Sequence, residues 1–347
     1  MTCLAVIVPC RNEAAVIARK LRNLAACRWP ASRGTHHVLV VDDGSDDATA
    51  EIARCEAAAL STPQVRFEVL ANDVRPGKPG AIERALQETR RACDFVILTD
   101  ADVVLAVDAL EELVQPLLDD ARNAIATGAQ RFVESLADSG DVAAAGGSEL
   151  RADGSFYDWA SACVRSLESR AGIVFSVHGQ LMAWPAKLDL LPTAGIAADD
   201  LDLMLQARVA GWRVVRAPKA VFFEVRAPRG EARKQQVIRR ARAYHQFLRH
   251  PRIHELRVAG SWLARRQAAL YLHAGRVRGP WTILALGSIF LAGWYLGPVA
   301  ATLVAAVNAL LFLPAWVLLR IVRSRMEIAE ALEARSPMGE RWETARR

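Results

Sequence analysis

The first two-thirds of the chain alternates short apolar runs with longer stretches whose apolar residues recur at helical spacing. The short runs predict strands and most of them lead into polar residues or glycine: LAVIVP, HHVLVVDD, VRFEVL, FVILTD and NAIATG. The stretches between them are rich in alanine and predict helices over residues 13–26, 47–59, 80–92 and 108–118. Alternation of this kind is typical of right-handed βαβ units, so it predicts an α/β domain with a mostly parallel sheet and flanking helices.

A different pattern begins at Trp281, where 39 residues pass without a charged side chain. A membrane-spanning helix needs about 20 apolar residues. The Gly297-Pro298 pair would divide the run into spans of about 281–296 and 299–319. We therefore expect a transmembrane helical hairpin, and the alternative is a hairpin buried in the core of a soluble domain. Arginines flank both ends of the run, which predicts that both ends lie in the cytoplasm.

Charge is spread unevenly along the chain, whose formal net charge is +6. Residues 226–278 carry fourteen Lys and Arg against two Glu, and they mix arginines with Trp, Leu and Tyr. Such a mixture is typical of helices that lie on anionic lipid. We divide the chain into an α/β domain (1–225), interfacial helices (226–280), the hairpin and a cytoplasmic tail (320–347). This division predicts a multi-pass protein of the cytoplasmic membrane whose α/β domain faces the cytoplasm.

Other features of the composition exclude some classes of protein. The six cysteines lie far apart and lack metal-binding spacing, which favours buried thiols in a reducing compartment. The basic excess is confined to one segment that has no nucleic-acid-binding motif, so no nucleic-acid partner is expected. The apolar run at the N-terminus is short and Arg11 follows it, which indicates a first strand and not a signal peptide.

Acidic residues gather where the predicted strands end. The first, second and fourth strands lead into PCRNE, DDGSDDAT and TDAD, and NDVRPGKPGA follows the third. Ligands of an open parallel sheet bind beyond the carboxyl ends of its strands, so these residues are candidates for a site. Asp100 and Asp102 can offer oxygens to one Mg²⁺ or Mn²⁺ that keeps other positions for phosphate oxygens. The alternative is that these aspartates only form a turn or a cap.

In this order the motifs resemble the successive signatures of family 2 glycosyltransferases, inverting enzymes of the GT-A fold. VIVPCRNEA, VVDDGSDDAT, GKPGAIERAL and LTDADV carry the resemblance, which continues to AADDLDLMLQARVAGWRVVRAPKAVFFE and covers roughly residues 3–245. It implies an inverting glycosyltransferase that uses a nucleotide-diphosphate sugar, expected to be a UDP-sugar. The expected acceptor is membrane-associated: a lipid, a polyprenyl phosphate or a lipid-linked saccharide.

The resemblance also implies roles for single residues. Donor contacts fall to Pro9 and Glu13 in the nucleotide pocket, Asp43 at the base, and Lys78 near the base or phosphates. Asp100 and Asp102 would hold the metal on the diphosphate. Asp199 and Asp200 match the acidic pair that supplies the catalytic base, and Asp200 is the expected base. A carboxylate there can accept the proton of the attacking hydroxyl, and a helix N-cap is the alternative role.

The basic segment holds a partial match to QxxRW, a motif of family members that extend polymers. In KQQVIRRAR, Gln236, Arg239 and Arg240 would share one helical face and could pair with the leaving diphosphate, although the tryptophan is absent. A solvated or lipid-facing basic helix is the alternative for this segment. For the whole protein the alternatives are a processive polysaccharide synthase subunit, an inert nucleotide-sugar binder, and a haloacid-dehalogenase-type phosphatase that uses Asp100 and Asp102.

Overall fold

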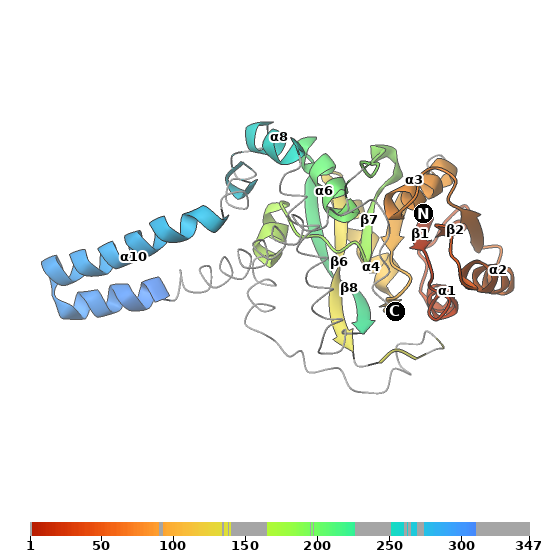
Figure 1. Cartoon of the computed structure of the whole chain (residues 1–347), viewed down its shortest axis with the longest axis horizontal. Helices are drawn as coiled ribbons and strands as arrows, with labels where there is room; N and C mark the ends of the chain where they lie inside the picture. The colour runs from red at the N-terminus through yellow and green to blue at the C-terminus, as the bar shows by residue number, and fades with distance from the viewer. Residues whose placement is uncertain are drawn as a thin grey trace.

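A computed structural model describes residues 2–89, 93–133, 135–137, 139, 165–194, 196, 198–225, 251–259, 262, 265–268 and 274–309. Within these residues the strands form one eight-stranded sheet with the order β3-β2-β1-β4-β7-β6-β8-β5 (Figure 1). All five strands predicted from the sequence are present: β1 (Leu4–Cys10), β2 (His36–Asp42), β3 (Val65–Ala71), β4 (Phe95–Thr99) and β6 (Asn123–Val133).

The first four strands form the parallel half of the sheet. β1 pairs in parallel with β2 and with β4, and β2 pairs in parallel with β3. The helices that connect the strands lie where the sequence predicts them: α1 (Ile17–Ala26), α2 (Thr49–Leu60), α3 (Lys78–Thr89) and α4 (Ala109–Asp119). Because β1, β2 and β4 run in the same direction, the acidic segments that follow them meet at one edge of the sheet.

The second half of the sheet is mixed, and the expectation of a mostly parallel sheet is corrected here. β7 (Leu181–Pro185) lies between β4 and β6 and runs antiparallel to both. β8 (Arg213–Val225) is parallel to β6 and pairs antiparallel with β5 (Val104–Leu105). The helical turn η1 (Ala186–Leu188) follows β7. β7 is a short apolar run without period-two alternation, so the local sequence pattern does not identify it as a strand. Its pairing partners, β4 and β6, are distant in the chain.

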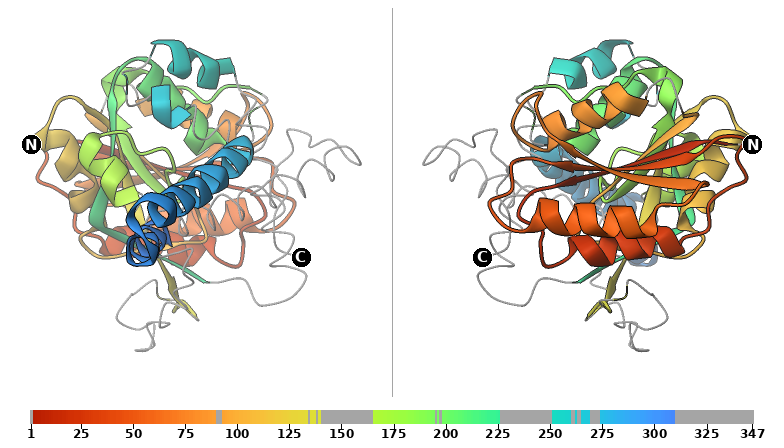
Figure 2. Two further views of the ribbon diagram at one scale, coloured as in Figure 1. Left: turned by 90° about the vertical axis from the view of Figure 1, so that its left-hand side faces the viewer. Right: turned by 90° about the vertical axis from the view of Figure 1, so that its right-hand side faces the viewer.

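Hydrophobic cores lie on both faces of the sheet. In β1, Val6 and Val8 face the core formed with α1, α2 and α4, whereas Ile7 faces the opposite core. That second core contains side chains of α3, α6 (Asp199–Val209) and α8 (Pro251–Ala259). Figure 2 shows α1 and α2 on one side of the parallel strands and α3 on the other. Strands covered on both faces are apolar along their whole length, which explains the continuous runs in the sequence.

The described part of the predicted interfacial segment packs against α6. Ile253 and Leu256 of α8 are fully buried, and Nη1 of Arg252 lies 2.9 Å from Oδ1 of Asp202. Further along the chain, Gln267 is buried and accepts hydrogen bonds from the guanidinium of Arg208 at 3.2 Å. The chain beyond the α/β domain is therefore held to α6 by apolar contacts and by two polar pairs, Arg252 with Asp202 and Gln267 with Arg208.

The C-terminal described residues form two helices joined at Gly297. α10 (Ala274–Leu296) ends at the predicted break, where Gly297 adopts a φ of 87°, and residues 298–309 form the second helix (Figure 1). The amide of Asn308 donates to Oγ of Ser288 at 2.8 Å, which joins the two helices. Within the described ranges, no helix has both the length and the apolar content required to cross a membrane. The predicted span 299–319 continues past the described residues, so its placement in a membrane stays a prediction.

Candidate functional site

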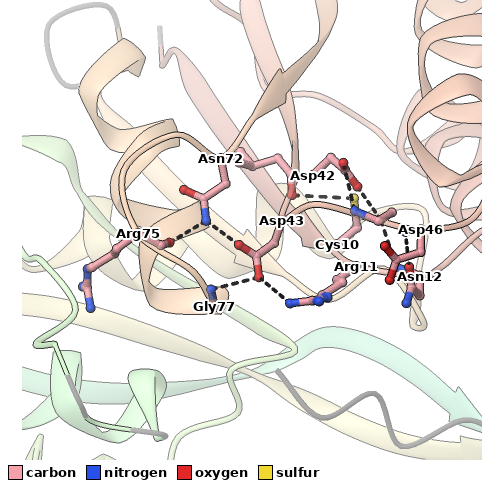
Figure 3. A network of polar contacts seen from close by, with 11 residues as sticks. Cys10, Arg11, Asn12, Asp42, Asp43, Asp46, Asn72, Arg75 and Gly77 are labelled. Atoms are coloured by element: carbon pink, nitrogen blue, oxygen red, sulfur yellow. Dashed lines mark hydrogen bonds and ion pairs between the residues drawn. The ribbon is translucent and has the colours of Figure 1, made fainter. Parts of the chain in front are cut away.

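Asp43 lies directly after β2, where loops that follow three different strands meet (Figure 3). Its carboxylate accepts hydrogen bonds from the amide of Asn72 and, at 2.9 Å, from the backbone N–H of Gly77. Nη1 of Arg11 lies 3.7 Å from the same carboxylate. Asp43 is thus buried at the predicted edge of the sheet and fixed by the loops after β1 and β3. Its contact with a nucleotide base stays a prediction.

The loop after β1 is linked to the loop after β2 by hydrogen bonds. The backbone N–H of Asn12 donates to Oγ of Ser45 at 2.9 Å, and its side-chain oxygen accepts from the backbone N–H of Asp46 at 2.8 Å. Asn12 has a φ of 54°, a left-handed conformation that asparagine tolerates better than most residues. The predicted donor contacts Pro9, in β1, and Glu13, in this loop, lie at the same edge of the sheet as Asp43.

Lys78, the first residue of α3, lies among carboxylates from two other elements. Its Nζ lies 2.8 Å from Oδ1 of Asp100, directly after β4, and 3.5 Å from Oδ2 of Asp199, at the start of α6. Burial acts to lower the pKa of Lys78, but the charges of Asp100 and Asp199 outweigh it and raise that pKa. Gly80 allows the backbone of Arg75 to lie against the first turn of α3, because a Cβ at position 80 would lie 1.8 Å from the carbonyl oxygen of Arg75.

Asp200 lies beside this charged cluster on the first turn of α6. Its carboxylate accepts hydrogen bonds from the backbone N–H groups of Gly179 at 3.1 Å and Leu201 at 2.8 Å. Burial, together with the negative charge of Asp199, raises the pKa of Asp200 to about 6. The capping residue of α6 is Ala198, which makes no side-chain hydrogen bond. A carboxylate whose pKa lies near neutrality has the property required of a general base.

The third acid of this turn, Asp202, has a different environment. It is fully buried and lies 2.9 Å from Nη1 of Arg252. Its other oxygen accepts from the backbone N–H of Thr193 at 2.7 Å and from Gln206 at 3.0 Å. Asp202 therefore ties α6 to α8, whereas Asp199 and Asp200 face the charged cluster.

The residues that follow β4 suit a divalent cation. Asp100 and Asp102 are half-buried, lie on one short turn and offer only oxygen atoms, the ligands that Mg²⁺ and Mn²⁺ prefer. The ammonium group against Asp100 shows that a cation can lie beside this carboxylate. Within the described residues, no three side chains of metal-binding type come together in a cluster. The predicted pair would leave the remaining metal positions to phosphate oxygens.

Several residues at this edge escape prediction from the sequence: Arg11, Asn72, Gly179, Gln180, Thr99 and Lys20. Most act through backbone atoms or pair with residues far away in the chain, so no local pattern identifies them. Lys20 is the exception, because it falls in the apolar stripe of α1 with Ile17, Leu21 and Leu24. A charged residue at such a position is a signal that the sequence does contain. Gln236, Arg239 and Arg240 lie outside the described residues.

Several curated proteins share sequence with this chain, and two of them illustrate the likeness. One is the succinoglycan biosynthesis protein ExoA of Rhizobium meliloti (strain 1021), 32% identical over 131 residues that cover 38% of this chain and 35% of the relative. The other is a beta-monoglucosyldiacylglycerol synthase of Trichormus variabilis, 32% identical over 136 residues that cover 37% of this chain and 27% of the relative. The chain spans about a third of the length of these relatives.

A solved structure shares the fold: the mannosyltransferase PcManGT from Pyrobaculum calidifontis, in complex with GDP-Man and Mn²⁺. It superposes with a TM-score of 0.65 at 24% identity, over 97% of this chain and 88% of its own. This likeness supports the predicted GT-A fold, and none of the similarities supports the haloacid-dehalogenase alternative. Residues 2–245 match the family described as glycosyltransferase-like family 2, so this chain belongs to that family.

Proposed function

We propose that the protein is an inverting glycosyltransferase that moves a sugar from a nucleotide-diphosphate sugar to a membrane-associated acceptor. The observation that carries the proposal is the cluster at the sheet edge, where Lys78 pairs with Asp100 and Asp199 next to Asp200. A cation, candidate metal ligands and a carboxylate of raised pKa are the groups that this transfer requires. They come from α3, β4 and α6, so folding alone brings them together.

Asp200 is the proposed base. In a single displacement, an acceptor hydroxyl attacks the anomeric carbon of the sugar while the bond to the diphosphate breaks. The carboxylate of Asp200 takes the hydroxyl proton, and the N–H of Gly179 holds that carboxylate in place. With a pKa of about 6, Asp200 is mostly deprotonated at neutral pH. Attack from the face opposite the leaving group inverts the configuration of the sugar.

The departing nucleoside diphosphate carries negative charge that the site must offset. The ammonium of Lys78 lies at the sheet edge to do so, and Gln236, Arg239 and Arg240 are proposed to add positive and polar contacts. Asp100 and Asp102 would hold Mg²⁺ or Mn²⁺, which when bound supplies further positive charge to the diphosphate. Asp43, Pro9 and Glu13 would place the nucleoside, with a UDP-sugar as the proposed donor.

The proposed acceptor and location rest on the C-terminal helices. Their described residues leave large apolar side chains more than half exposed: Leu284, Phe290, Trp294, Tyr295, Val299 and Leu303. Large apolar side chains exposed in such number on two neighbouring helices indicate contact with lipid or with another protein. With the charge-free run of 281–319, this exposure supports a multi-pass anchor in the cytoplasmic membrane. A relative named as a beta-monoglucosyldiacylglycerol synthase supports a lipid as acceptor, and a polyprenyl phosphate or a lipid-linked saccharide is proposed beside it.

The test is incubation of the purified protein with a panel of labelled nucleotide sugars, Mn²⁺ or Mg²⁺, and membrane lipid extract. One nucleotide sugar is expected to label an extractable lipid product, and the Asp200→Asn variant is expected to lose most of that labelling. Label in a long polysaccharide would favour a processive synthase instead. Donor binding without transfer to any acceptor would indicate an inert binder and would overturn the proposal.

A further inference from the structure

Lys20 is a fully buried lysine on α1, directly beneath the end of β4. Its Nζ donates to Oγ1 of Thr99 at 2.8 Å and to the carbonyl oxygen of Val103 at 3.1 Å. Thr99 and Val103 are the residues immediately before and after the segment 100–102. The ammonium group therefore holds both ends of the turn that carries Asp100 and Asp102.

The contact continues from Thr99 to the turn beside Asp200. The hydroxyl of Thr99 donates to the carbonyl oxygen of Gln180 at 2.9 Å. The preceding residue, Gly179, donates its N–H to Oδ2 of Asp200 at 3.1 Å. A continuous path of hydrogen bonds and one short piece of backbone thus leads from Lys20 to the proposed base.

The position of Lys20 has a cost for the fold. Lysine is almost never fully buried, because removing an ammonium group from water is unfavourable unless it is well paired. Ile17, Leu21 and Leu24 fill the same face of α1, so an apolar residue would suit this core. Lys20 provides hydrogen bonds to both ends of the 100–102 turn, and an apolar residue could not provide them.

We propose that Lys20 is a positioning residue that fixes the 100–102 turn and, through Thr99 and the 178–180 turn, sets the metal-holding carboxylates relative to Asp200. This inference rests on the proposed function. Lys20 itself is proposed to touch neither the donor nor the metal. It acts by holding the backbone on which Asp100 and Asp102 stand, as residues behind metal ligands do in other metal sites.

The test is a measurement of the Mn²⁺ affinity of the Lys20→Met variant, which keeps an unbranched side chain as far as Cε and removes the ammonium group. Binding is measured from the spectroscopic signal of free Mn²⁺, in the presence of UDP or GDP. Loss of the positive charge alone would tighten Mn²⁺ binding, because a repelling cation is removed. Loss of positioning weakens it by about tenfold or more. The sign of the change therefore separates the two effects.

Thr99→Val is the second variant, because it keeps the charge of Lys20 and removes only the hydroxyl between Lys20 and Gln180. We expect weaker Mn²⁺ binding in it also, and a non-additive effect when the two changes are combined. Lys219→Met is the matched control, since Lys219 is exposed on β8 and pairs with Glu112 at 4.0 Å. Its Mn²⁺ affinity is expected to equal that of the wild type.

The outcomes separate this inference from the proposed function. Wild-type protein that binds no Mn²⁺ with either nucleotide would overturn the proposed function itself. Wild-type protein that binds Mn²⁺, with unchanged or tighter binding in Lys20→Met, would overturn the inference alone. Thermal unfolding shows whether each variant is folded. If Lys20→Met is not, Thr99→Val decides the matter, and unchanged binding in that variant overturns the inference.

Discussion

Nζ of Lys78 lies 2.8 Å from Oδ1 of Asp100, so a side chain proposed to meet the diphosphate already pairs with a carboxylate proposed to hold the metal. The same Nζ lies 3.5 Å from Asp199, which is almost fully buried. An ammonium group and a divalent cation cannot both lie against the same carboxylate oxygen without repulsion. We therefore expect Lys78 to compete with a metal at Asp100 until a diphosphate binds that can accept contacts from both.

Lys78→Met tests this competition. We expect Mn²⁺ alone to bind more tightly to the variant, because the competing ammonium is gone, and the nucleotide sugar to bind about tenfold more weakly, because a charged donor to phosphate is lost. Calorimetric titration with Mn²⁺, and then with the nucleotide sugar, measures both affinities. Lys187→Met, at an exposed position on η1, is the control and should change neither. An unchanged Mn²⁺ affinity in Lys78→Met would show that the two cations do not compete.

Asp202→Ala should lower the stability of the fold more than it lowers the rate of sugar transfer. The substitution leaves the guanidinium of Arg252 without its fully buried partner and also removes the acceptor of the Thr193 N–H. Arg252 is itself partly exposed, so we expect a loss of about 2–3 kcal/mol in the free energy of unfolding, at or below the lower end for a broken buried pair. Denaturant unfolding measures it. Arg252→Ala should cost a similar amount, and the double variant less than the sum. Additive losses would contradict the pairing.

The sequence predicts the parallel half of the fold well for a physical reason. Strands such as β1 are covered on both faces, so their continuous apolar runs stand out, and the acids that follow them mark the edge where a ligand is expected to bind. The position of β7 could not be predicted, because its partners β4 and β6 are distant in the chain. Likewise Asp200 and Asp202 look alike in AADDLDLM, and contacts with distant residues distinguish them. Asp202 pairs with Arg252 of α8, whereas Asp200 accepts a hydrogen bond from the backbone N–H of Gly179.

Removal of divalent metal should abolish sugar transfer, because Asp100 and Asp102 alone add negative charge where the diphosphate must bind. Excess chelator is expected to stop product formation, and added Mn²⁺ or Mg²⁺ to restore it. Asp102→Asn removes one charged ligand and should raise the metal concentration that gives half-maximal transfer by about tenfold or more. The rate at which labelled product forms from a labelled donor measures both the loss of transfer in chelator and the metal requirement of Asp102→Asn. Full activity in excess chelator would exclude a metal-dependent mechanism.

A reporter fused after Arg347 should lie in the cytoplasm. The charge-free run of 281–319 is flanked on both sides by arginines, which are retained on the cytoplasmic side of a membrane. A reporter pair that is active on only one side of the membrane measures the location of this end. A second fusion, after Gly297, should report the opposite side. A signal from outside the cytoplasm at Arg347 would refute the two-span arrangement.

Asp200→Asn separates the chemical step from donor binding. Asparagine has nearly the shape of aspartate and can still accept from the N–H of Gly179, but it cannot take a proton from the acceptor hydroxyl. General bases contribute about 10²–10⁴ of a rate, so transfer should fall at least about a hundredfold. Donor and metal affinity should stay near those of the wild type, because the residues proposed to supply those contacts, Lys78, Asp43 and Asp100, lie on other elements.

The pH dependence of the same variant identifies the base. Burial and the charge of Asp199 raise the pKa of Asp200 to about 6, and a general base works only when deprotonated. The kcat/KM of the wild type should therefore rise as the pH increases through about 6 and then level off. Asp200→Asn has no such group, so its residual kcat/KM should lack this step. Initial rates from pH 5 to pH 8 at saturating metal give both profiles. Asp199→Asn should keep a step but move it to lower pH, because the charge of Asp199 that helps to raise the pKa of Asp200 is gone, and should lose less activity than Asp200→Asn. A variant of Asp199 that loses the step, with Asp200→Asn still active, would assign the base to Asp199 instead.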